Sequence, residues 1–381
     1  MKPILYPQNT PKSGFSRNGL GFISHCTRCI STEERNGLYE LSLDLMTTDR
    51  LAAQVVPGSF IKVKANPYDP LQLFEIYSSH ITNNRITATA QHIRYIALAN
   101  SLTESTTVQR RTPQQWWEYI EPILAVPTEF SFSSNVAAAN AIRAAQLKPI
   151  RLGSFLMGEE GSMLESFGGE FHFDNFNIEL LGRRGRDTGK CLRYGAHIST
   201  YEQSLDSTTC YTHIMPFAEC TTKSSTGETL PSRAVYPETA IDLQNPNLTY
   251  KRVLVYDFSD YLQKEKFTLI EDETSGRISN WGDGVTLLMR AANEYISAKG
   301  AELTAPVANI IVDVPAALSQ LADLRLCDTL DVIYSPLGAK TRAKVIRTEY
   351  DCLSETYTKI ELGTARKKLA SLFGGKNIGG A

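Results

Sequence analysis

The chain has 381 residues, 42% of them hydrophobic and 21% charged, a composition that excludes a wholly disordered protein. Lys and Arg number 39 against 41 Asp and Glu, for a net charge of −2, and this balance excludes tight, sequence-independent binding to nucleic acid. No segment approaches the roughly 18 apolar residues of a membrane span, and no secretory leader precedes the seven cysteines, so we expect a soluble protein made in the cytosol with free thiols.

The first hundred residues are predicted to form a β-meander. Leu41, Leu43 and Leu45 alternate with polar residues, which is the period of a half-buried strand. Further strands are expected at residues 60–64, 73–77 and 86–89, with a tight turn at Asn83-Asn84 before the last of them.

A helix is predicted to begin near residue 112. Thr112 can cap it, Pro113 suits the first helical position, and Gln115 completes a capping-box spacing. Pro127 ends this helix at the latest. Helical or loop segments are then expected at residues 136–145 and 159–167, and strands at 170–181 and 191–194 on either side of a basic turn at 183–187.

The second half combines a loop, a helix and a further meander. Residues 222–233 are the most loop-like interior segment. A helix is predicted from Asp283, as N-cap, to Lys299, with Gly300 in the left-handed position that follows a helix. Strands should follow at 330–334, 343–347 and 357–362, and a mobile glycine-rich tail at 374–381.

The two meanders can be aligned with each other. An offset of 269 places residues 60–63 on 329–332 and residues 74–77 on 343–346 without a gap. The third strand, 86–90, falls on 357–361 once two residues are added. We therefore predict that the chain carries two copies of one meander near its two ends.

Metal, redox and phosphate sites are weakly indicated. Cys26-x-x-Cys29 beside His25 is the sharpest signal, but a structural zinc needs four ligands, and Cys210, His213 and Cys220 could join only if the fold brought them close. Ordinary thiols are favoured, with no metal and no cofactor. The segment 185–191 departs from the phosphate-loop motif at Arg184 and Cys191, which favours a hairpin turn.

Hydrolytic chemistry is also weakly indicated. Glu165, Glu170 and Asp174 are close enough in sequence to suggest paired carboxylates for glycoside cleavage. Carboxylates at this density are common at strand ends, and no serine-, zinc- or cysteine-hydrolase motif is present. Residue patterns alone thus indicate a β-rich, multidomain protein without a visible active site.

The segment 164–178 carries a more specific signature. It contains Gly168-Gly169-Glu170 and Asp174-Asn175-Phe176, and Arg186-Asp187 and Tyr194-Gly195 follow it. This combination resembles the hallmark of the prophage endopeptidase tail family. Its members, the tail-associated lysin (Tal) proteins, are tail-tip or baseplate hub proteins of long-tailed phages of Gram-positive bacteria. The resemblance covers roughly residues 30–365.

The resemblance implies a β-rich α+β multidomain fold. Two β-barrel-like tube domains with intervening α/β segments are expected, similar to the hubs of contractile-tailed phages and type VI secretion spikes. The implied division is a first tube-like domain at 1–100, a helix-containing α/β domain at 101–170, a mixed region at 171–300 that contributes to the second tube-like domain and an accessory domain, closing strands at 301–365, and a mobile tail at 366–381.

The function implied by the resemblance is structural. A homotrimer would present six related domains to a sixfold tail tube, close its distal end, and open to release tape-measure protein and DNA. The implied partners are the distal tail protein and the tape-measure protein, with DNA passing unbound, no membrane anchor, and a location at the tail tip of the virion. In longer members the wall-degrading activity lies in an extra domain, so we expect no enzyme here. Two alternatives stay open, namely a cell-wall hydrolase using Glu170, Asp174 or a Cys/His pair, and a receptor- or carbohydrate-binding module.

Overall fold

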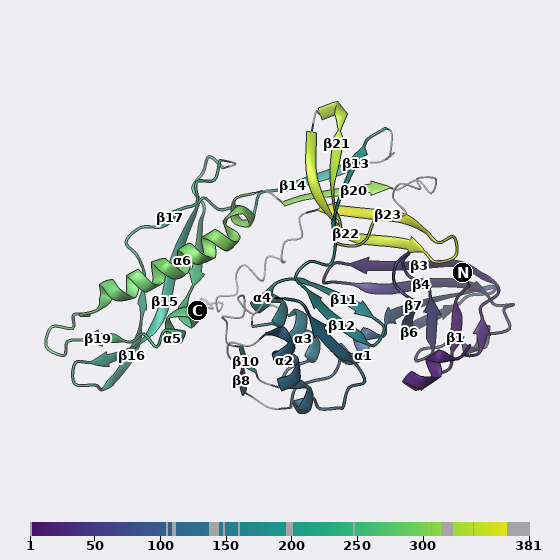
Figure 1. Cartoon of the computed structure of the whole chain (residues 1–381), viewed down its shortest axis with the longest axis horizontal. Coiled ribbons are helices and arrows are strands. Elements are labelled where there is room, and N and C mark those ends of the chain that lie inside the picture. The colour runs from purple at the N-terminus through teal and green to yellow at the C-terminus, as the bar shows by residue number, and fades with distance from the viewer. Residues whose placement is uncertain are drawn as a thin grey trace. The chain divides into compact units, whose positions relative to one another are not determined.

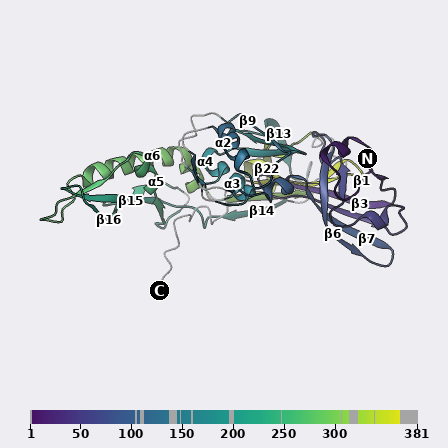
Figure 2. The same ribbon diagram turned by 90° about the horizontal axis from the view of Figure 1, so that it is seen from below.

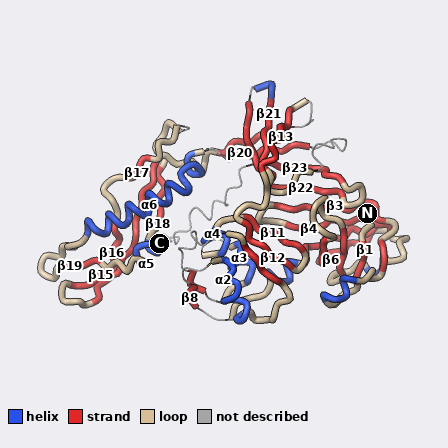
Figure 3. The backbone as a smooth tube through the Cα atoms, viewed as in Figure 1, coloured by secondary structure: helices blue, strands red, loops and turns tan. Residues whose placement is uncertain are grey.

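The computed structural model describes residues 2–103, 106–108, 112–136, 145–147, 149–158, 161–195, 201–246, 248–305, 307–313, 323–337 and 339–363. The predicted tail at 374–381 and most of the predicted segment at 136–145 lie outside them. The chain forms two compact units: unit 1 comprises Met1–Gln203 and Asn309–Ala365, and unit 2 contains Ser204–Ala308. Strands predominate over helices, as expected (Figure 3). None of the helices among the described residues has both the length and the apolar character needed to cross a membrane.

One sheet of 13 strands organises unit 1 (Figure 1). Its order is β14-β20-β23-β22-β3-β4-β7-β6-β5-β1-β2, with β13 paired to β21 and β21 paired to β22. The strands are β1 (Ile4–Tyr6), β2 (Gly21–Phe22), β3 (Cys26–Glu34), β4 (Tyr39–Met46), β5 (Phe60–Val63), β6 (Gln72–Ile81), β7 (Arg85–His92), β13 (Asp187–Arg193), β14 (Tyr201–Asp206), β20 (Val307–Asp313), β21 (Thr329–Tyr334), β22 (Ala339–Asp351) and β23 (Thr356–Gly363). Short 3-10 turns η1 (Lys12–Ser16), η2 (Ala52–Gln54) and η6 (Ser335–Leu337) connect some of them.

The predicted repeat is present as a four-stranded unit. The order β4-β7-β6-β5 in the first copy is the order β20-β23-β22-β21 in the second. Phe60 pairs with Glu75, and Thr329 pairs with Lys344, so adding 269 to the first register gives the second. Both copies share one interruption of the ladder, between Ile76 and Ser78 in β6 and at the equivalent positions in β22, and β22 has a second one between Glu349 and Tyr350. The offset of 269 is therefore confirmed.

A turn before the second strand is duplicated as well. The Gly58 N–H donates to the Ile76 carbonyl at 2.7 Å, and the Cys327 N–H donates to the Val345 carbonyl at 2.9 Å. Gly58 and Cys327 have φ of +85° and +74°, a left-handed conformation that a residue with a Cβ rarely adopts. The second copy keeps this conformation even without glycine.

The third strand of the repeat corrects the prediction by one residue. Ala90 pairs with Ile76 and Leu362 with Val345, which requires an offset of 272 and not 271. The reason is side-chain alternation, because a slip of one residue would exchange the two faces of the strand. Offset 272 places Ala90 on Leu362, and both are buried.

A second layer of unit 1 packs four short helices against a three-stranded sheet. The helices are α1 (Arg94–Leu98), α2 (Pro113–Ile120), α3 (Leu152–Met157) and α4 (Met163–Phe167), the turn η3 (Glu121–Ile123) follows α2, and the strands are β9 (Ser131–Ser134), β11 (Glu170–Asp174) and β12 (Asn177–Leu181). A two-stranded ribbon joins β8 (Thr106–Val108) to β10 (Ala145–Leu147). The predicted capping box is confirmed, since the Thr112 hydroxyl accepts from the Gln115 N–H at 3.2 Å and the Gln115 side chain accepts from the Thr112 N–H at 3.1 Å.

Unit 2 is built around one long strand, β15 (His213–Ser224). Four strands pair with it: β16 (Thr229–Val235), β17 (Ile241–Asp242), β18 (Val253–Asp257) and β19 (Leu269–Glu271). Helices α5 (Ser259–Lys264) and α6 (Trp281–Thr304) complete a common core with these strands. The predicted loop at 222–233 is wrong, because most of it lies in the β15–β16 hairpin, where every second residue of β15 is buried.

The predicted bounds of the long helix are also corrected. Helix α6 begins at Trp281, two residues before the expected cap, and the Gly284 N–H donates to the Asn280 carbonyl at 3.2 Å. Asp283 lies in the first turn, where its negative charge favours the helix. The helix continues through Gly300 to Thr304 because Leu303, buried in the core of unit 2, lies on its last turn.

Candidate functional site

The motif hairpin, formed by β11 and β12, begins at two glycines with different constraints. Gly168 and Gly169 have φ of +70° and +96°. A Cβ on Gly169 would lie 2.6 Å from the Leu181 carbonyl oxygen, whereas one on Gly168 would meet no atom within 4 Å. Gly169 is therefore required for the close approach of β11 and β12, and Gly168 for its backbone conformation alone.

Asn36, in the turn between β3 and β4, ties the motif hairpin to the first repeat. Its side-chain oxygen accepts from the Phe171 N–H at 2.7 Å, and its amide nitrogen donates to the Gly169 carbonyl at 3.2 Å. Asn36 itself has φ of +51°. One side chain thus satisfies two backbone groups of a segment more than 130 residues away.

Glu170 joins three segments at one carboxylate. Its Oε1 accepts from Arg35 Nε at 3.0 Å and from Lys344 Nζ of β22 at 2.5 Å, and its Oε2 accepts from the Arg184 N–H at 2.7 Å. The side chain is only 2% exposed. Burial alone would raise the pKa of Glu170, but the bonds from Lys344 and the Arg184 N–H, with the Arg35 charge, lower it below its ordinary value. Glu170 is thus held as an anion between the two repeats.

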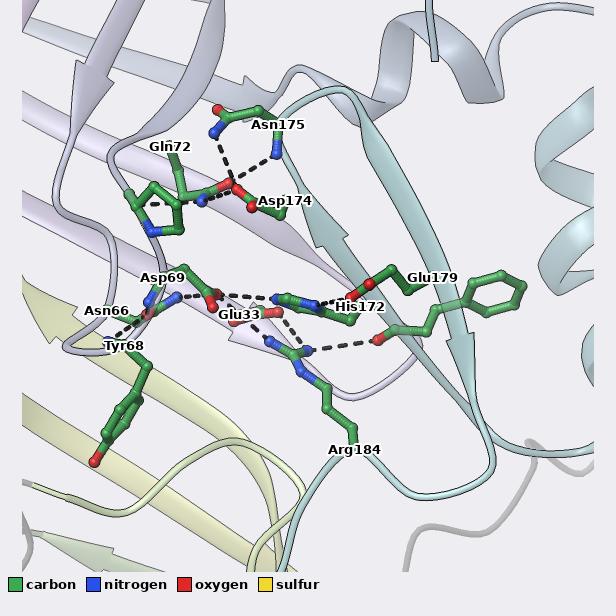
Figure 4. A network of polar contacts seen from close by, with 12 residues as sticks. Glu33, Asn66, Tyr68, Asp69, Gln72, His172, Asp174, Asn175, Glu179 and Arg184 are labelled. Carbon is green, nitrogen blue, oxygen red and sulfur yellow. Dashed lines mark hydrogen bonds and ion pairs between the residues drawn. The ribbon is translucent and has the colours of Figure 1, made fainter. Parts of the chain in front are cut away.

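Arg184 carries the same network toward the first repeat (Figure 4). Its Nη1 donates to Glu33 Oε1 at 2.7 Å, and its Nη2 lies 3.9 Å from Asp69 Oδ2. Burial would lower the pKa of Arg184, but the neighbouring Glu33 and Asp69 charges raise it above its ordinary value. The guanidinium is therefore a permanent cation between two nearly buried carboxylates.

His172 bridges two carboxylates on the same side of the motif hairpin (Figure 4). Its Nδ1 lies 2.7 Å from Glu179 Oε2, and its Nε2 lies 3.2 Å from Asp69 Oδ2. Burial lowers the pKa of His172, yet the contacts with Asp69 and Glu179 raise it overall. Burial would raise the pKa of Asp69, but His172, Arg184 and Asn66 lower it to about 2.

The turn of the motif hairpin docks on the first residues of β6. Gln72 Nε2 donates to Asp174 Oδ1 at 2.8 Å, and the Leu73 N–H donates to Asn175 Oδ1 at 2.9 Å. Asn175 has φ of +51°, a conformation that Asn tolerates better than most residues. The ring of Phe176 lies 4.7 Å from Lys12 Nζ. These motif residues hold a turn in place rather than present a chemical group.

The remaining motif residues lie along β13, beside the second repeat. The Arg186 N–H donates to Asp328 Oδ1 at 2.7 Å, and Asp187 forms an ion pair with Arg342. Tyr194 packs edge-on against Tyr334 with ring centroids 4.9 Å apart. Gly195 follows with φ of +79°. The ten predicted residues are thus distributed between the motif hairpin and β13, and the structure does not bring them into one pocket.

The partners of these residues were not predicted. They are Glu33, Arg35, Asn36, Asp69, Gln72, His172, Glu179 and Lys344, and they come from strands and turns far apart in sequence. Gln72 is a fully buried polar residue in a strand and therefore needs a partner, but the predicted strand began one residue after it, so no signal for this contact was present in the sequence.

The geometry of Glu170 and Glu165 does not resemble a glycosidase acid. A general acid needs a raised pKa, whereas Glu170 has a lowered pKa and three donors. Glu165 Oε2 accepts from the Gly161 N–H at 2.7 Å, at the start of α4. Both carboxylates therefore have structural partners.

The cysteine and glycine motifs also have structural roles. Cys29 is buried in β3, and hydrogen bonds with Cys26 and Cys352, together with burial, raise its pKa, which makes the thiol unreactive. Cys210 and Cys220 are buried in unit 2. No group of three or more His, Cys, Asp or Glu in the described part of the chain could hold a metal ion. A Cβ on Gly185 would lie 2.1 Å from the Cys327 carbonyl carbon, so this glycine serves close packing.

Comparison with known proteins identifies the fold. No family model matches the chain, and no curated protein matches its sequence. Among solved structures, it is similar to the prophage tail protein gp18 of Listeria monocytogenes EGD-e, with a TM-score of 0.57, 14% identity, and 98% of this chain and 97% of that chain covered.

Two further tail proteins have the same fold. The 43 kDa tail protein of prophage MuSo2 from Shewanella oneidensis has a TM-score of 0.56 at 11% identity, with 96% of this chain and 98% of that chain covered. The tail protein of Neisseria meningitidis MC58 has a TM-score of 0.50 at 10% identity, with 95% and 96% covered. The chain therefore has the fold of prophage tail proteins over nearly its whole length.

Proposed function

We propose that the chain is a structural hub of a phage or prophage-derived tail tip. In this proposal it is a homotrimer that closes the distal end of the tail tube and opens to release tape-measure protein and DNA. The observation that carries the proposal is the duplicated four-stranded unit, with the same register and the same ladder interruption in both copies. Three chains with two copies each supply six equivalent units, which is the number a sixfold tube requires.

The fold and the buried network support the proposal. The tail proteins to which the chain is similar share its fold across at least 95% of its length. Glu170 links the motif hairpin to both repeats through Arg35 and Lys344, so the two repeats of one chain are held in a fixed relation. A rigid pair of repeats is what a collar made of three chains needs.

The finer assignments follow from the same hub. The first tube-like domain is placed in 1–100 and the closing strands of the second in 301–365, each completing a β-barrel-like module in the assembled tube. The distal tail protein binds the hub on the tube side, and the tape-measure protein lies behind it until release. DNA passes without specific binding, consistent with a net charge of −2, because a basic channel would retain phosphates. The motif residues from Gly168 to Gly195 act in this scheme as structural connectors.

Light scattering and negative-stain microscopy test the hub. We expect purified full-length protein to have the mass of three chains, alone or after addition of the distal tail protein, and a ring with threefold symmetry. A single-chain mass under both conditions would refute the trimer.

The proposed absence of enzymatic activity has its own test. We expect no clearing in zymograms on host cell walls. Clearing by the wild type that disappears in Glu170→Gln would instead assign a hydrolase activity to this chain.

A further inference from the structure

One edge of β6 has no partner strand among the described residues. Strand β5 pairs only with the first four residues of β6, and β7 occupies the opposite edge. The Thr82 N–H donates to the Arg85 carbonyl of β7 at 2.8 Å. Because backbone groups alternate along a strand, the N–H and C=O groups of Ser79 and Ile81 point away from β7. Residues 78–81 therefore present an open edge, and they belong to the β6–β7 hairpin that is labelled in Figure 2.

The equivalent edge of the second repeat is paired within the chain. Strand β22 pairs antiparallel with β3 along residues 347–351. This ladder is bounded by the bond from the Arg35 N–H to the Ile346 carbonyl and by the bond from the Cys352 N–H to the Cys29 carbonyl, both at 2.8 Å. Subtracting 269 from residues 347–351 gives residues 78–82, which include the open edge of β6. The pairing of β22 with β3 thus indicates how a strand could pair with the open edge of β6.

The two edges differ in exposure as this equivalence requires. Tyr350, paired with Ser31 of β3, is 2% exposed. Ile81, its equivalent in the first repeat, is 64% exposed, and Tyr77 on the same strand is 47% exposed. Large apolar side chains on an open strand edge promote pairing with another chain.

The sheet order identifies the strand that fits this edge. Strand β3 lies beside β4 in the first repeat, and β14 lies beside β20, the equivalent of β4, in the second. The outer edge of β3 is already occupied by β22, whereas β14 is the terminal strand of the described sheet. We propose that residues 78–81 of β6 pair antiparallel with β14 of a second copy of this chain, as β22 pairs with β3.

This interface deepens the proposed function, on which it rests. Each copy offers the β6 edge to one neighbour and β14 to another, so the contact is of head-to-tail type and closes into a ring when the rotation allows. In a ring of three copies the sheet continues from chain to chain. The pairing of β22 with β3 inside each chain then alternates with the pairing of β6 with β14 between chains.

Proline and lysine variants test the interface. Ser79→Pro removes an N–H that β7 does not use, so the hairpin should fold while the edge loses a donor. Ile81→Lys places a charge on the same edge. The control Thr87→Lys puts the same charge on an exposed position of β7, whose two edges are both paired. Thr348→Pro, at the position equivalent to Ser79, should destabilise the single chain because Thr348 pairs with Glu33.

Light scattering and thermal melting of the full-length variants give the readout. We expect the Ser79→Pro and Ile81→Lys variants to have the mass of one chain and not of three. Their melting temperature should equal that of the isolated wild-type chain. The Thr87→Lys variant should keep the mass of three chains. A wild type and variants that all remain trimeric would refute this interface and leave the proposed hub intact. A wild type that is a single chain under every condition would refute both.

Cysteine cross-linking identifies the partner strand and covers the case in which an edge variant fails to fold. Chains with Ser79→Cys are mixed with chains carrying Glu202→Cys, Ser204→Cys or Asp206→Cys in β14. A disulfide between the two kinds of chain, absent when either single variant is tested alone, is the expected result. Native-like trimers that form no such bond at any of the three β14 positions would overturn the assignment to β14.

Discussion

Replacing Glu170 by Gln should be among the most damaging single changes in unit 1. The substitution keeps the shape of the side chain but removes the charge that Lys344 and Arg35 face. Removing one member of a buried ion pair costs about 3–5 kcal/mol. Lys344 and Arg35 are 28% and 20% exposed, so water compensates part of the loss, and we expect about 3 kcal/mol.

The expected loss can be read as a melting temperature. Unit 1 has about 260 residues, and an unfolding entropy of roughly 2.1 cal/mol/K per residue converts about 3 kcal/mol into a decrease of about 5 °C. Glu179→Gln is the matched control, because Glu179 is 36% exposed and its loss should cost less than about 1 kcal/mol. Calorimetry or circular dichroism at neutral pH measures both variants.

The pH dependence and a double-mutant cycle sharpen this test. The pKa of Glu170 is lowered in the folded state. Its contribution to the free energy of unfolding is therefore present above the ordinary carboxyl pKa and is lost as pH falls through the folded pKa. The difference between wild type and Glu170→Gln should therefore shrink in acid. In the cycle with Lys344→Gln, the double variant should be about 1–2 kcal/mol more stable than the sum of the single changes predicts. Additive effects, or a cost of Glu170→Gln below about 1 kcal/mol, would refute the reasoning.

Three further changes probe the same region. Gly169→Ala should cost several kcal/mol more than Gly168→Ala in urea titrations, because only the first adds a clash with a backbone oxygen to the left-handed strain. Asn36→Gly should cost about 1–3 kcal/mol through two lost hydrogen bonds, and Asn36→Ala about 1 kcal/mol more for a Cβ at φ of +51°; equal costs would contradict the role of backbone strain. The pKa of His172 is raised in the folded state. Its contribution to the free energy of unfolding is therefore complete below the ordinary histidine pKa and is lost as pH rises through the folded pKa. The urea midpoint should therefore fall in the wild type as pH rises above the ordinary histidine pKa and through the folded one, but less in His172→Gln, and equal falls in both proteins would refute the assignment.

Features encoded by neighbouring residues could be predicted from the sequence. The capping box at Thr112 depends only on the four residues from Thr112 to Gln115, and the structure contains it as expected. The offset of 269 was visible because the apolar positions of two strands recur at that distance. The third strand was misplaced by one residue because its partner strand, and not its own sequence, fixes the register.

Features that depend on the tertiary fold could not be predicted. The loop-like composition of residues 222–233 was overridden by the partners of β15, which pair with it on both edges. The motif glycines and Glu170 were singled out, but their roles depend on Asn36 and Lys344, which lie more than 130 residues away. The sequence favoured a structural role for Glu170 over a catalytic one only through the absence of hydrolase motifs, whereas its three donors give the physical reason.

Unit 2 is inserted between two strands that are neighbours in the sheet of unit 1, and this position is useful for protein engineering. In the first repeat β3 and β4 are joined by a turn of four residues, whereas their counterparts β14 and β20 are separated by about 100 residues of unit 2. Because β14 and β20 are neighbours in the sheet, the inserted segment starts and finishes at adjacent points, as inserted domains commonly do. The inserted segment could therefore be replaced by a short turn or by a foreign domain without changing the sheet of unit 1.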